Sequence, residues 1–381
     1  MMKGSRCDIY DKSLELLRGA LWQQQCDVPV DAQEWEGIRQ FASEQALDGI
    51  MLDALLFISQ GSMPSRAMKM QMIAMQLQVV KANEHMNDVL LEFTAELARR
   101  NIPYALMKGQ GVASLYPHPL HRVSGDVDLY VPMEYYHTVN KGMMAYGGKR
   151  SHETRMHVDY TAKGVMWELH HGIYYFQKDV RNVIFNRLMD EAMAEAPVFA
   201  PVGKGMVRVL PATMNVLLLL AHMQDHFYCE GVGLRQLCDY ALLLDREYAN
   251  IDMGRLERAL EELSMTRTYR VIGALCVRHL GLPSDRLMIA PTVADNSLAD
   301  AIMKDCLKGG NFGRSDHPGR STVWKWLRYY VRFLWRLIKF RNLCPSEALW
   351  WPLGKLYRLF TGTVYISEER SVLNKQRNGE W

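Results

Sequence analysis

Two aspartates separated by one residue are the first candidates for chemistry. Asp126 and Asp128 lie in residues 125–132, where acidic and apolar residues alternate as in a β-strand. Residues two apart in a strand point the same way, so both carboxylates project from one face. Like charges this close repel unless a cation lies between them. The pair predicts a site for Mg²⁺ or Mn²⁺, ions that prefer oxygen ligands.

A third carboxylate is expected, because two metal ions that clamp a nucleotide phosphate usually need one. Residues 155–161 and 165–170 alternate on either side of a turn at 162–164 and predict a β-hairpin. Its second strand carries Glu168, the favoured third metal ligand and catalytic residue. Asp159 on the partner strand is the alternative. His170 either orients a metal-bound carboxylate or packs at the strand end.

Phosphate groups need donors that approach closely, and the chain offers them upstream of the aspartates. The apolar run 102–107 predicts a strand that ends at Lys108, Gly109, Gln110 and Gly111. Backbone N–H groups at a turn into a helix, together with one ammonium, can hold phosphates. Arg122 and Ser124 are expected to add contacts.

These residues belong to an expected α+β protein: a small mixed sheet flanked by N-terminal helices and a C-terminal helical domain. Helical periodicity covers 1–100, and the α/β core is placed at 101–205. A helical domain follows at 206–320, and a basic amphipathic helical segment at 321–381. Within the helical domain, His222 and His226 lie one turn apart; structural histidines, a zinc site and a wall of the nucleotide cleft are the alternatives.

Residues 321–341 combine a cationic stripe with an apolar stripe. Residues 321–381 contain 11 basic and 4 acidic side chains, a balance of +7. Three interpretations remain. The apolar stripe covers the domain core, the segment lies on an anionic membrane surface, or it tracks RNA. The stripe consists of Trp324, Leu327, Val331, Leu334, Trp335 and Ile338.

Composition excludes several classes of protein. The 381 residues are 49% hydrophobic and 23% charged, as in globular proteins, and the net charge of +3 gives no strong nucleic-acid signal. Seven scattered cysteines without a CxxC pair, and an N-terminus without an apolar signal region, predict a cytoplasmic protein. The alternative is a peripheral protein at the inner membrane face.

Several motifs together resemble a bacterial family of uncharacterised nucleotidyltransferases, within the superfamily that includes DNA polymerase beta. The resemblance extends over about residues 85–350. It is carried by Leu106-Met107-Lys108-Gly109, Tyr116-Pro117, Arg122, Gly125-Asp126-Val127-Asp128-Leu129, Glu168-Leu169-His170, Gly233-Leu234-Arg235-Gln236-Leu237-Cys238-Asp239 and Gly310-Asn311-Phe312-Gly313. It implies that Asp126, Asp128 and Glu168 form the metal-binding triad and that Gly109 lies in the nucleotide-binding turn. Where the superfamily usually has Gly-Ser, this chain has Gly109-Gln110.

The expected activity is a magnesium-dependent transfer of a nucleoside monophosphate from an NTP to an unidentified acceptor, with release of pyrophosphate. Lys108, Gly109, Gln110, Gly111, Arg122 and Ser124 are the expected nucleotide-binding residues. The alternative is a catalytically weak nucleotide-binding module that acts as a sensor or interaction protein. The absence of the usual serine hydroxyl motivates that alternative.

Overall fold

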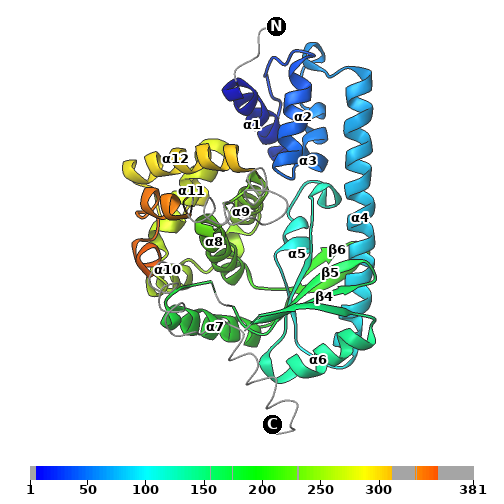
Figure 1. Cartoon of the computed structure of the whole chain (residues 1–381), viewed down its shortest axis with the longest axis vertical. Helices are drawn as coiled ribbons and strands as arrows, with labels where there is room; N and C mark the ends of the chain where they lie inside the picture. Colours follow the sequence, from blue (N-terminus) through cyan, green and yellow to red (C-terminus); the bar gives the residue numbers. More distant parts are fainter. Residues whose placement is uncertain are drawn as a thin grey trace.

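The computed structural model describes residues 6–310, apart from 155, 174 and 230, together with residues 331 and 333–350. The N-terminal part contains α1 (Arg6–Trp22), α2 (Glu34–Glu44), α3 (Asp48–Asp53) and the long helix α4 (Arg66–Arg99). Figure 1 shows α4 running from this helical group down to the sheet. The side chain of Ser65 begins α4 by accepting a hydrogen bond from the backbone N–H of Met68.

A seven-stranded mixed sheet forms the centre of the α/β part. The strands are β1 (Ala105–Met107), β2 (Val127–Tyr130), β3 (Lys149–Glu153), β4 (His157–Ala162), β5 (Val165–His170), β6 (Val198–Val202) and β7 (Gly205–Val209). Their spatial order is β3-β4-β5-β2-β1-β7-β6. The pairs β2–β5 and β1–β7 are parallel, and the other neighbouring strands are antiparallel. The predicted hairpin is the pair β4–β5, which is confirmed.

The two faces of the central strands have different neighbours. Val127 and Leu129 of β2 and Trp167 of β5 pack with the C-terminal half of α4 and with α6 (Met133–Ala145). Asp128 and Glu168 alternate with these apolar residues and so project from the opposite face. The alternation of acidic and apolar residues therefore reflects one packed face and one functional face.

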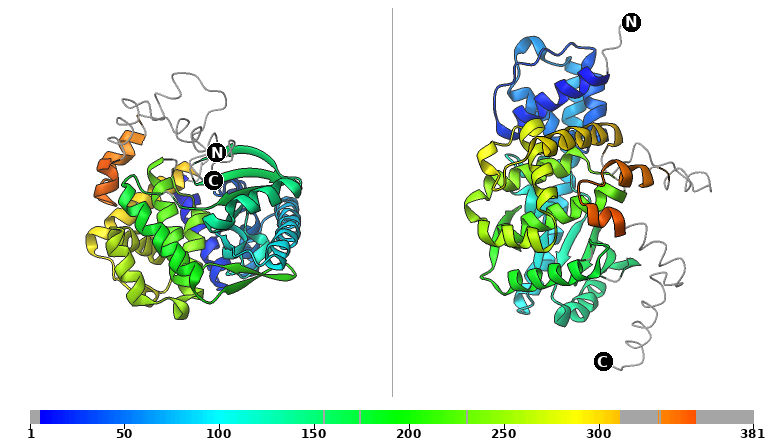
Figure 2. Two further views of the ribbon diagram at one scale, coloured as in Figure 1. Left: turned by 90° about the horizontal axis from the view of Figure 1, so that it is seen from below. Right: turned by 90° about the vertical axis from the view of Figure 1, so that its left-hand side faces the viewer.

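The remaining helices form a largely separate group beside the sheet. It contains α7 (Asp179–Ala194), α8 (Ala212–Cys229), α9 (Leu234–Arg246), α10 (Met253–Glu262), α11 (Thr266–Leu280) and α12 (Val293–Gly309). Figure 2 shows this group from two further directions. The short helix α5 (Gly109–Ala113) contacts both β1 and α9, so it lies between the sheet and the helical group.

The predicted α+β class, with a mixed-sheet core between helical regions, is confirmed. The domain limits at 100, 205 and 320 stay predictions. Helix α4 ends at Arg99, inside the first predicted region, but it packs on α3 at one end and on the sheet at the other. Residues 311–330 lie outside the described residues. Among the helices of the described part, none is both long enough and apolar enough to cross a membrane.

The described end of the 321–341 segment does not have the orientation expected if its apolar stripe covered the domain core. In the described residues, Phe333, Leu337 and Phe340 are buried, whereas Val331, Leu334, Trp335 and Ile338 of the predicted apolar stripe are exposed. The interpretation that this stripe covers the domain core is therefore wrong for these residues. The periodicity was ambiguous because two apolar stripes run along the same helix.

A buried ion pair joins the segment before β2 to the helical group. Arg122 donates from Nε and Nη2 to the two carboxylate oxygens of Asp239 on α9, at 2.7 and 2.6 Å. Tyr116 donates its hydroxyl to the same carboxylate at 2.7 Å. Arg235 of α9 donates to the carbonyl oxygen of Val123 at 2.7 Å. The α9 motif thus holds the loop that leads into Asp126.

The turn between β1 and α5 is tight. Lys108 and Gly109 both have positive φ angles, +50° and +40°. Residues other than glycine seldom adopt such angles. A Cβ atom on Gly109 would lie 3.3 Å from the carbonyl oxygen of Asp126. The turn therefore brings the Lys108–Gly109 backbone directly against the start of the acidic strand.

We expect Asp239→Ala to lower the free energy of unfolding by about 3–5 kcal/mol, because it leaves the buried Arg122 guanidinium without its carboxylate. The matched control is Asp300→Ala, which removes an exposed pair with Arg278 and should cost about 0–1 kcal/mol. Urea denaturation of both variants measures the difference. Equal losses would show that the Arg122–Asp239 pair does not anchor the loop.

We expect Gly109→Ala to destabilise the protein by about 1–3 kcal/mol, because the positive φ and the close carbonyl both oppose a Cβ atom. Gly142 in α6 has no heavy atom near its Cβ position, so Gly142→Ala should instead stabilise by up to about 1 kcal/mol. Thermal unfolding of the two variants tests this. A neutral Gly109→Ala would contradict the tight turn.

Candidate functional site

The acidic centre lies where β2 and β5 run side by side. The register pairs Asp128 with Glu168 on these parallel strands. His170, two residues further along β5, places Nε2 3.3 Å from Asp128 Oδ1 and 3.1 Å from Glu168 Oε2. Ligand atoms of these three residues all lie within 4.8 Å of one another, close enough to hold one metal ion. Of the two alternatives for His170, the structure therefore places its imidazole at the carboxylates.

A second group of possible ligands overlaps the first. Asp159 of β4 lies opposite Glu168 in the β4–β5 register. Ligand atoms of His157, Asp159 and Glu168 also lie within 4.8 Å of one another. Glu168 is shared by both groups, and Asp159 belongs to the second alone. The choice of Glu168 rather than Asp159 as the third catalytic carboxylate stays a prediction.

Asp126 lies just before β2 and outside both groups. Burial and the nearby carboxylate of Asp128 raise the pKa of Asp126 to about 6, because both disfavour its ionised form. A bound cation would relieve this cost. Its assignment as a metal ligand stays a prediction.

Lys108 supplies positive charge to the acidic centre. Its Nζ lies 2.7 Å from Asp128 Oδ1, and both side chains are largely buried. Burial alone would raise the pKa of Asp128, but Lys108 and His170 outweigh it and hold the pKa well below its ordinary value. For Lys108, burial opposes the charge, and the carboxylates, led by Asp128, raise the pKa above the usual range. The strained turn at Lys108 therefore positions an ammonium against the deepest carboxylate.

The other predicted nucleotide-binding residues form a hydrogen-bonded network. Gln110 donates to Asn83 and accepts a hydrogen bond from Ser124 at 3.0 Å. Ser124 in turn accepts from Arg122 Nη1 at 3.0 Å. Gly109, Gln110 and Gly111 are buried. Because these side chains have protein partners, the network fixes the shape of the turn, and their contacts with a nucleotide stay predictions.

Two residues near the acidic centre extend the set found from sequence. The Tyr175 ring lies 5.4 Å from the ring of His222 on α8, measured between centroids. Tyr175 Oη and His222 Nδ1 are buried and have no hydrogen-bond partner among the described residues. Burial raises the pKa of Tyr175 to about 12, against the opposing effect of Lys108. Burial, with Lys108 and His226, holds the pKa of His222 well below its ordinary value.

These two side chains place a helix of the helical group beside Lys108 and Asp128. Helical spacing had singled out His222, with the cleft wall as one alternative, and its proximity to the acidic centre favours that alternative. Tyr175 follows β5 in an irregular segment, and no local pattern marks it.

The chain is similar to several known proteins. Among solved structures, the chain is similar to the antibiotic-resistance factor ANT(2'')-Ia, with 16% identity, coverage of 49% of this chain and 93% of that one, and a TM-score of 0.34. It is also similar to an antigenic nucleotidyltransferase-like protein from Paracoccidioides brasiliensis, with 12% identity, coverage of 57% and 95%, and a TM-score of 0.31. A search of curated protein sequences gives no match. A family model described as uncharacterised nucleotidyltransferase matches residues 31–281, and the chain belongs to this family.

Proposed function

We propose that the protein transfers a nucleoside monophosphate from an NTP to an acceptor, with release of pyrophosphate, and that it needs Mg²⁺ or Mn²⁺. The observation that carries this proposal is the convergence of Asp128, Glu168 and His170 on one small volume beside the Lys108 ammonium. Family membership supports nucleotidyl transfer in general. The acceptor remains unidentified.

The residues at the acidic centre fit a divalent cation. Asp128 and Glu168 lie opposite each other on β2 and β5, and their charges disfavour the ionised form of Asp126 just before β2. Lys108 is the one lysine or arginine with an ion pair to any of these three carboxylates among the described residues. The remaining negative charge and the oxygen-rich donor set suit Mg²⁺ or Mn²⁺. Asp128 and Glu168 would hold the ion, with His170 as a nitrogen ligand and Asp126 as a further carboxylate. A bound ion would neutralise charge on the phosphates.

Lys108 has two consecutive partners in this proposal. Without nucleotide, its ammonium compensates Asp128 at 2.7 Å. When the triphosphate binds, the ammonium would move from Asp128 to the β- and γ-phosphates. The backbone N–H groups of residues 109–111 would bind the same phosphates. The ammonium can leave Asp128 because the incoming cation replaces its charge. Binding of cation and triphosphate is therefore expected to be cooperative.

The chemistry depends mainly on positioning and on neutralising charge. Glu168 orients the acceptor group for attack on the α-phosphorus. Tyr175, from the segment after β5, and His222 of α8 form one wall of the site. The network of Gln110, Ser124 and Arg122 keeps the turn in place.

A nucleotide-binding sensor is the second candidate function. The specific observation that favours it is Gln110, which stands in the place of the superfamily's serine and is tied to Asn83 and Ser124. A glutamine side chain has no hydroxyl to contact the triphosphate, and the amide of Gln110 is already hydrogen-bonded to these two residues. Calorimetry with NTP and Mg²⁺, beside a pyrophosphate-release assay, separates the two functions: binding without turnover on any acceptor supports the sensor.

We expect Asp126→Asn and Asp128→Asn to reduce pyrophosphate release at least about 100-fold, because each removes a charge that positions the cation. The assay uses each NTP with Mn²⁺ and a panel of acceptors that includes water. Asp126→Asn should keep its thermal stability, since it relieves repulsion, whereas Asp128→Asn should lose stability because Lys108 loses its partner. Asp300→Asn is the surface control and should retain full activity.

The same assay decides the third carboxylate. Glu168→Gln should reduce release as strongly as Asp128→Asn, and Asp159→Asn should reduce it less than about tenfold. The reverse order would assign the role to Asp159. More than a tenth of normal activity in Asp128→Asn would contradict the proposed site.

We expect Mn²⁺ to raise the unfolding temperature and to show nitrogen hyperfine coupling in pulsed electron paramagnetic resonance, because binding to the folded state stabilises it and His170 supplies a ring nitrogen. His170→Ala should lose the coupling. His152→Ala, on β3 and outside both ligand groups, is the matched control and should keep it. Bound Mn²⁺ without coupling would exclude His170 as a ligand, and a protein that binds no Mn²⁺ even with NTP would exclude the site.

A further inference from the structure

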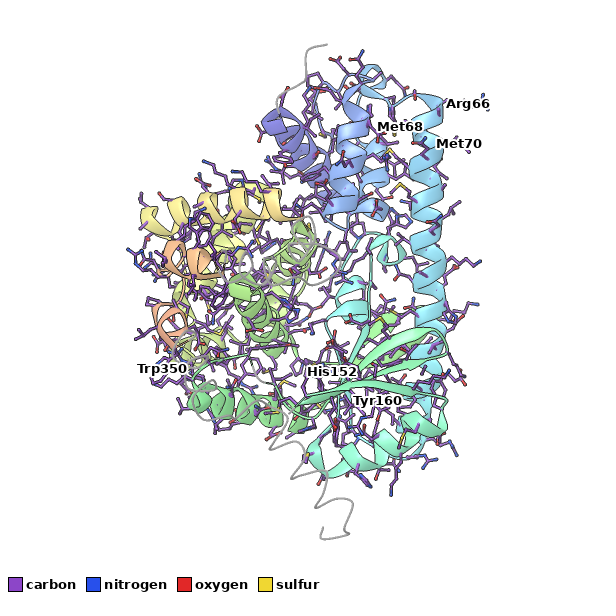
Figure 3. All side chains as sticks on the ribbon, in the orientation of Figure 1. Arg66, Met68, Met70, His152, Tyr160 and Trp350 are labelled. Carbon is purple, nitrogen blue, oxygen red and sulfur yellow. The ribbon has the colours of Figure 1, made fainter. Side chains whose placement is uncertain are left out.

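An apolar surface lies on the outside of the helical group, away from the acidic centre. We call it the outer apolar surface. It contains six large side chains that are between 42% and 65% exposed: Val331, Leu334, Trp335, Ile338, Leu349 and Trp350. Both views in Figure 2 show residues 331–350 at the margin of the molecule. Figure 3 places the labelled Trp350 at the outer edge, far from the sheet residues His152 and Tyr160.

The first four residues form one continuous helical stripe. They follow each other at steps of three, one and three residues, so they share one side of the helix. The opposite side contains Phe333, Leu337 and Phe340, which are at most 5% exposed and pack into the core. One apolar side of the helix therefore packs into the core, and a second apolar side is exposed to solvent.

Basic side chains flank this stripe. Lys339 lies roughly a quarter turn from its centre at about 100° per residue, and Arg341 follows in the turn after the helix. Lys339 Nζ lies 4.4 Å from the centre of the Trp335 ring, and Arg341 Nη1 donates to the carbonyl oxygen of Ile338 at 2.8 Å. Arg336 is not part of the surface, because it pairs with Asp305 at 2.8 Å. An apolar stripe beside two cations is the pattern of a helix that lies in a membrane interface.

Nothing acidic balances these cations in the described segment. Glu347 is the one acidic residue between 331 and 350, and it is buried in an ion pair with Arg181 at 2.6 Å. Two copies of the chain that met through this surface would therefore bring cations together. The surrounding sequence has the same character: five of the nine tryptophans fall between residues 324 and 351. Tryptophan favours the interface between lipid and water.

We propose that the outer apolar surface binds the protein to an anionic phospholipid membrane, with the four-residue stripe and Trp350 entering the headgroup region and Lys339 and Arg341 contacting lipid phosphates. This inference is independent of nucleotidyl transfer, because it uses none of the residues of the acidic centre.

Flotation of the full chain with vesicles tests the proposal. We expect partition into vesicles of phosphatidylcholine containing 30% phosphatidylglycerol, weaker partition into phosphatidylcholine alone, and a decrease with added salt. Lys339→Glu with Arg341→Glu should weaken binding to the anionic vesicles about tenfold or more, at about fivefold per basic residue. Trp335→Ser with Ile338→Ser should weaken it at least tenfold.

The controls separate binding from folding and from activity. Leu77 on α4 is also strongly exposed, so Leu77→Ser should bind vesicles like the unmodified chain. The unfolding temperature should be unchanged in Trp335→Ser with Ile338→Ser, since both side chains are exposed. Pyrophosphate release in the absence of vesicles should also be unchanged, so a failure of the proposed activity leaves this test intact.

Two results would overturn the proposal. One is equal partition of the unmodified chain and both double variants. The other is a stable dimer in light scattering that Trp335→Ser with Ile338→Ser converts to a monomer, without vesicle binding by either protein. That second result would assign the surface to a second copy of the chain.

Discussion

The buried contact between Lys108 and Asp128 is the constraint around which the site is built. A carboxylate that is only a few percent exposed needs a compensating charge, because burial strongly disfavours an isolated ion. The compensating ammonium comes from a residue with positive φ, at the end of a strand antiparallel to that of the aspartate. The ion pair between Lys108 and Asp128 therefore offsets the free-energy cost of the strained backbone at Lys108. A metal cation from solution would compete with the Lys108 ammonium for Asp128 Oδ1.

The helical group contributes to the site in two different ways. Asp239 and Arg235 of α9 hold the loop that enters β2, and α8 brings His222 toward the acidic centre. The sheet alone would supply the carboxylates but would leave that loop without its anchor. In the α9 motif that resembles the family, Asp239 and Arg235 hold a side chain and a backbone carbonyl of the loop.

Features with a local cause could be predicted from the sequence. The strand period of two placed Asp128 on the face opposite the packed apolar residues, the turn at 162–164 set the hairpin, and the apolar run before Lys108 marked β1. Asp126 lies just before β2. Contacts between distant segments could not be predicted, because Arg122 and Asp239 are separated by 117 residues and no spacing rule links them. Tyr175 was missed for the same reason. The predicted orientation of the helix at 333–339 was wrong for a different reason. Phe333, Leu337 and Phe340 form a stripe as apolar as the one that faces outward, so the sequence does not distinguish the two.

Gln45 connects three distant parts of the chain. Its fully buried side chain accepts a hydrogen bond from the backbone N–H of Leu234, in the first turn of α9, and donates to the carbonyl oxygen of Cys306 in α12. One amide from the N-terminal helices therefore completes the end of the helix that carries Arg235 and Asp239. Removing α1–α3 to obtain a shorter fragment would leave the buried N–H of Leu234 and the carbonyl oxygen of Cys306 without this partner, at a cost of about 1–3 kcal/mol for each unsatisfied group.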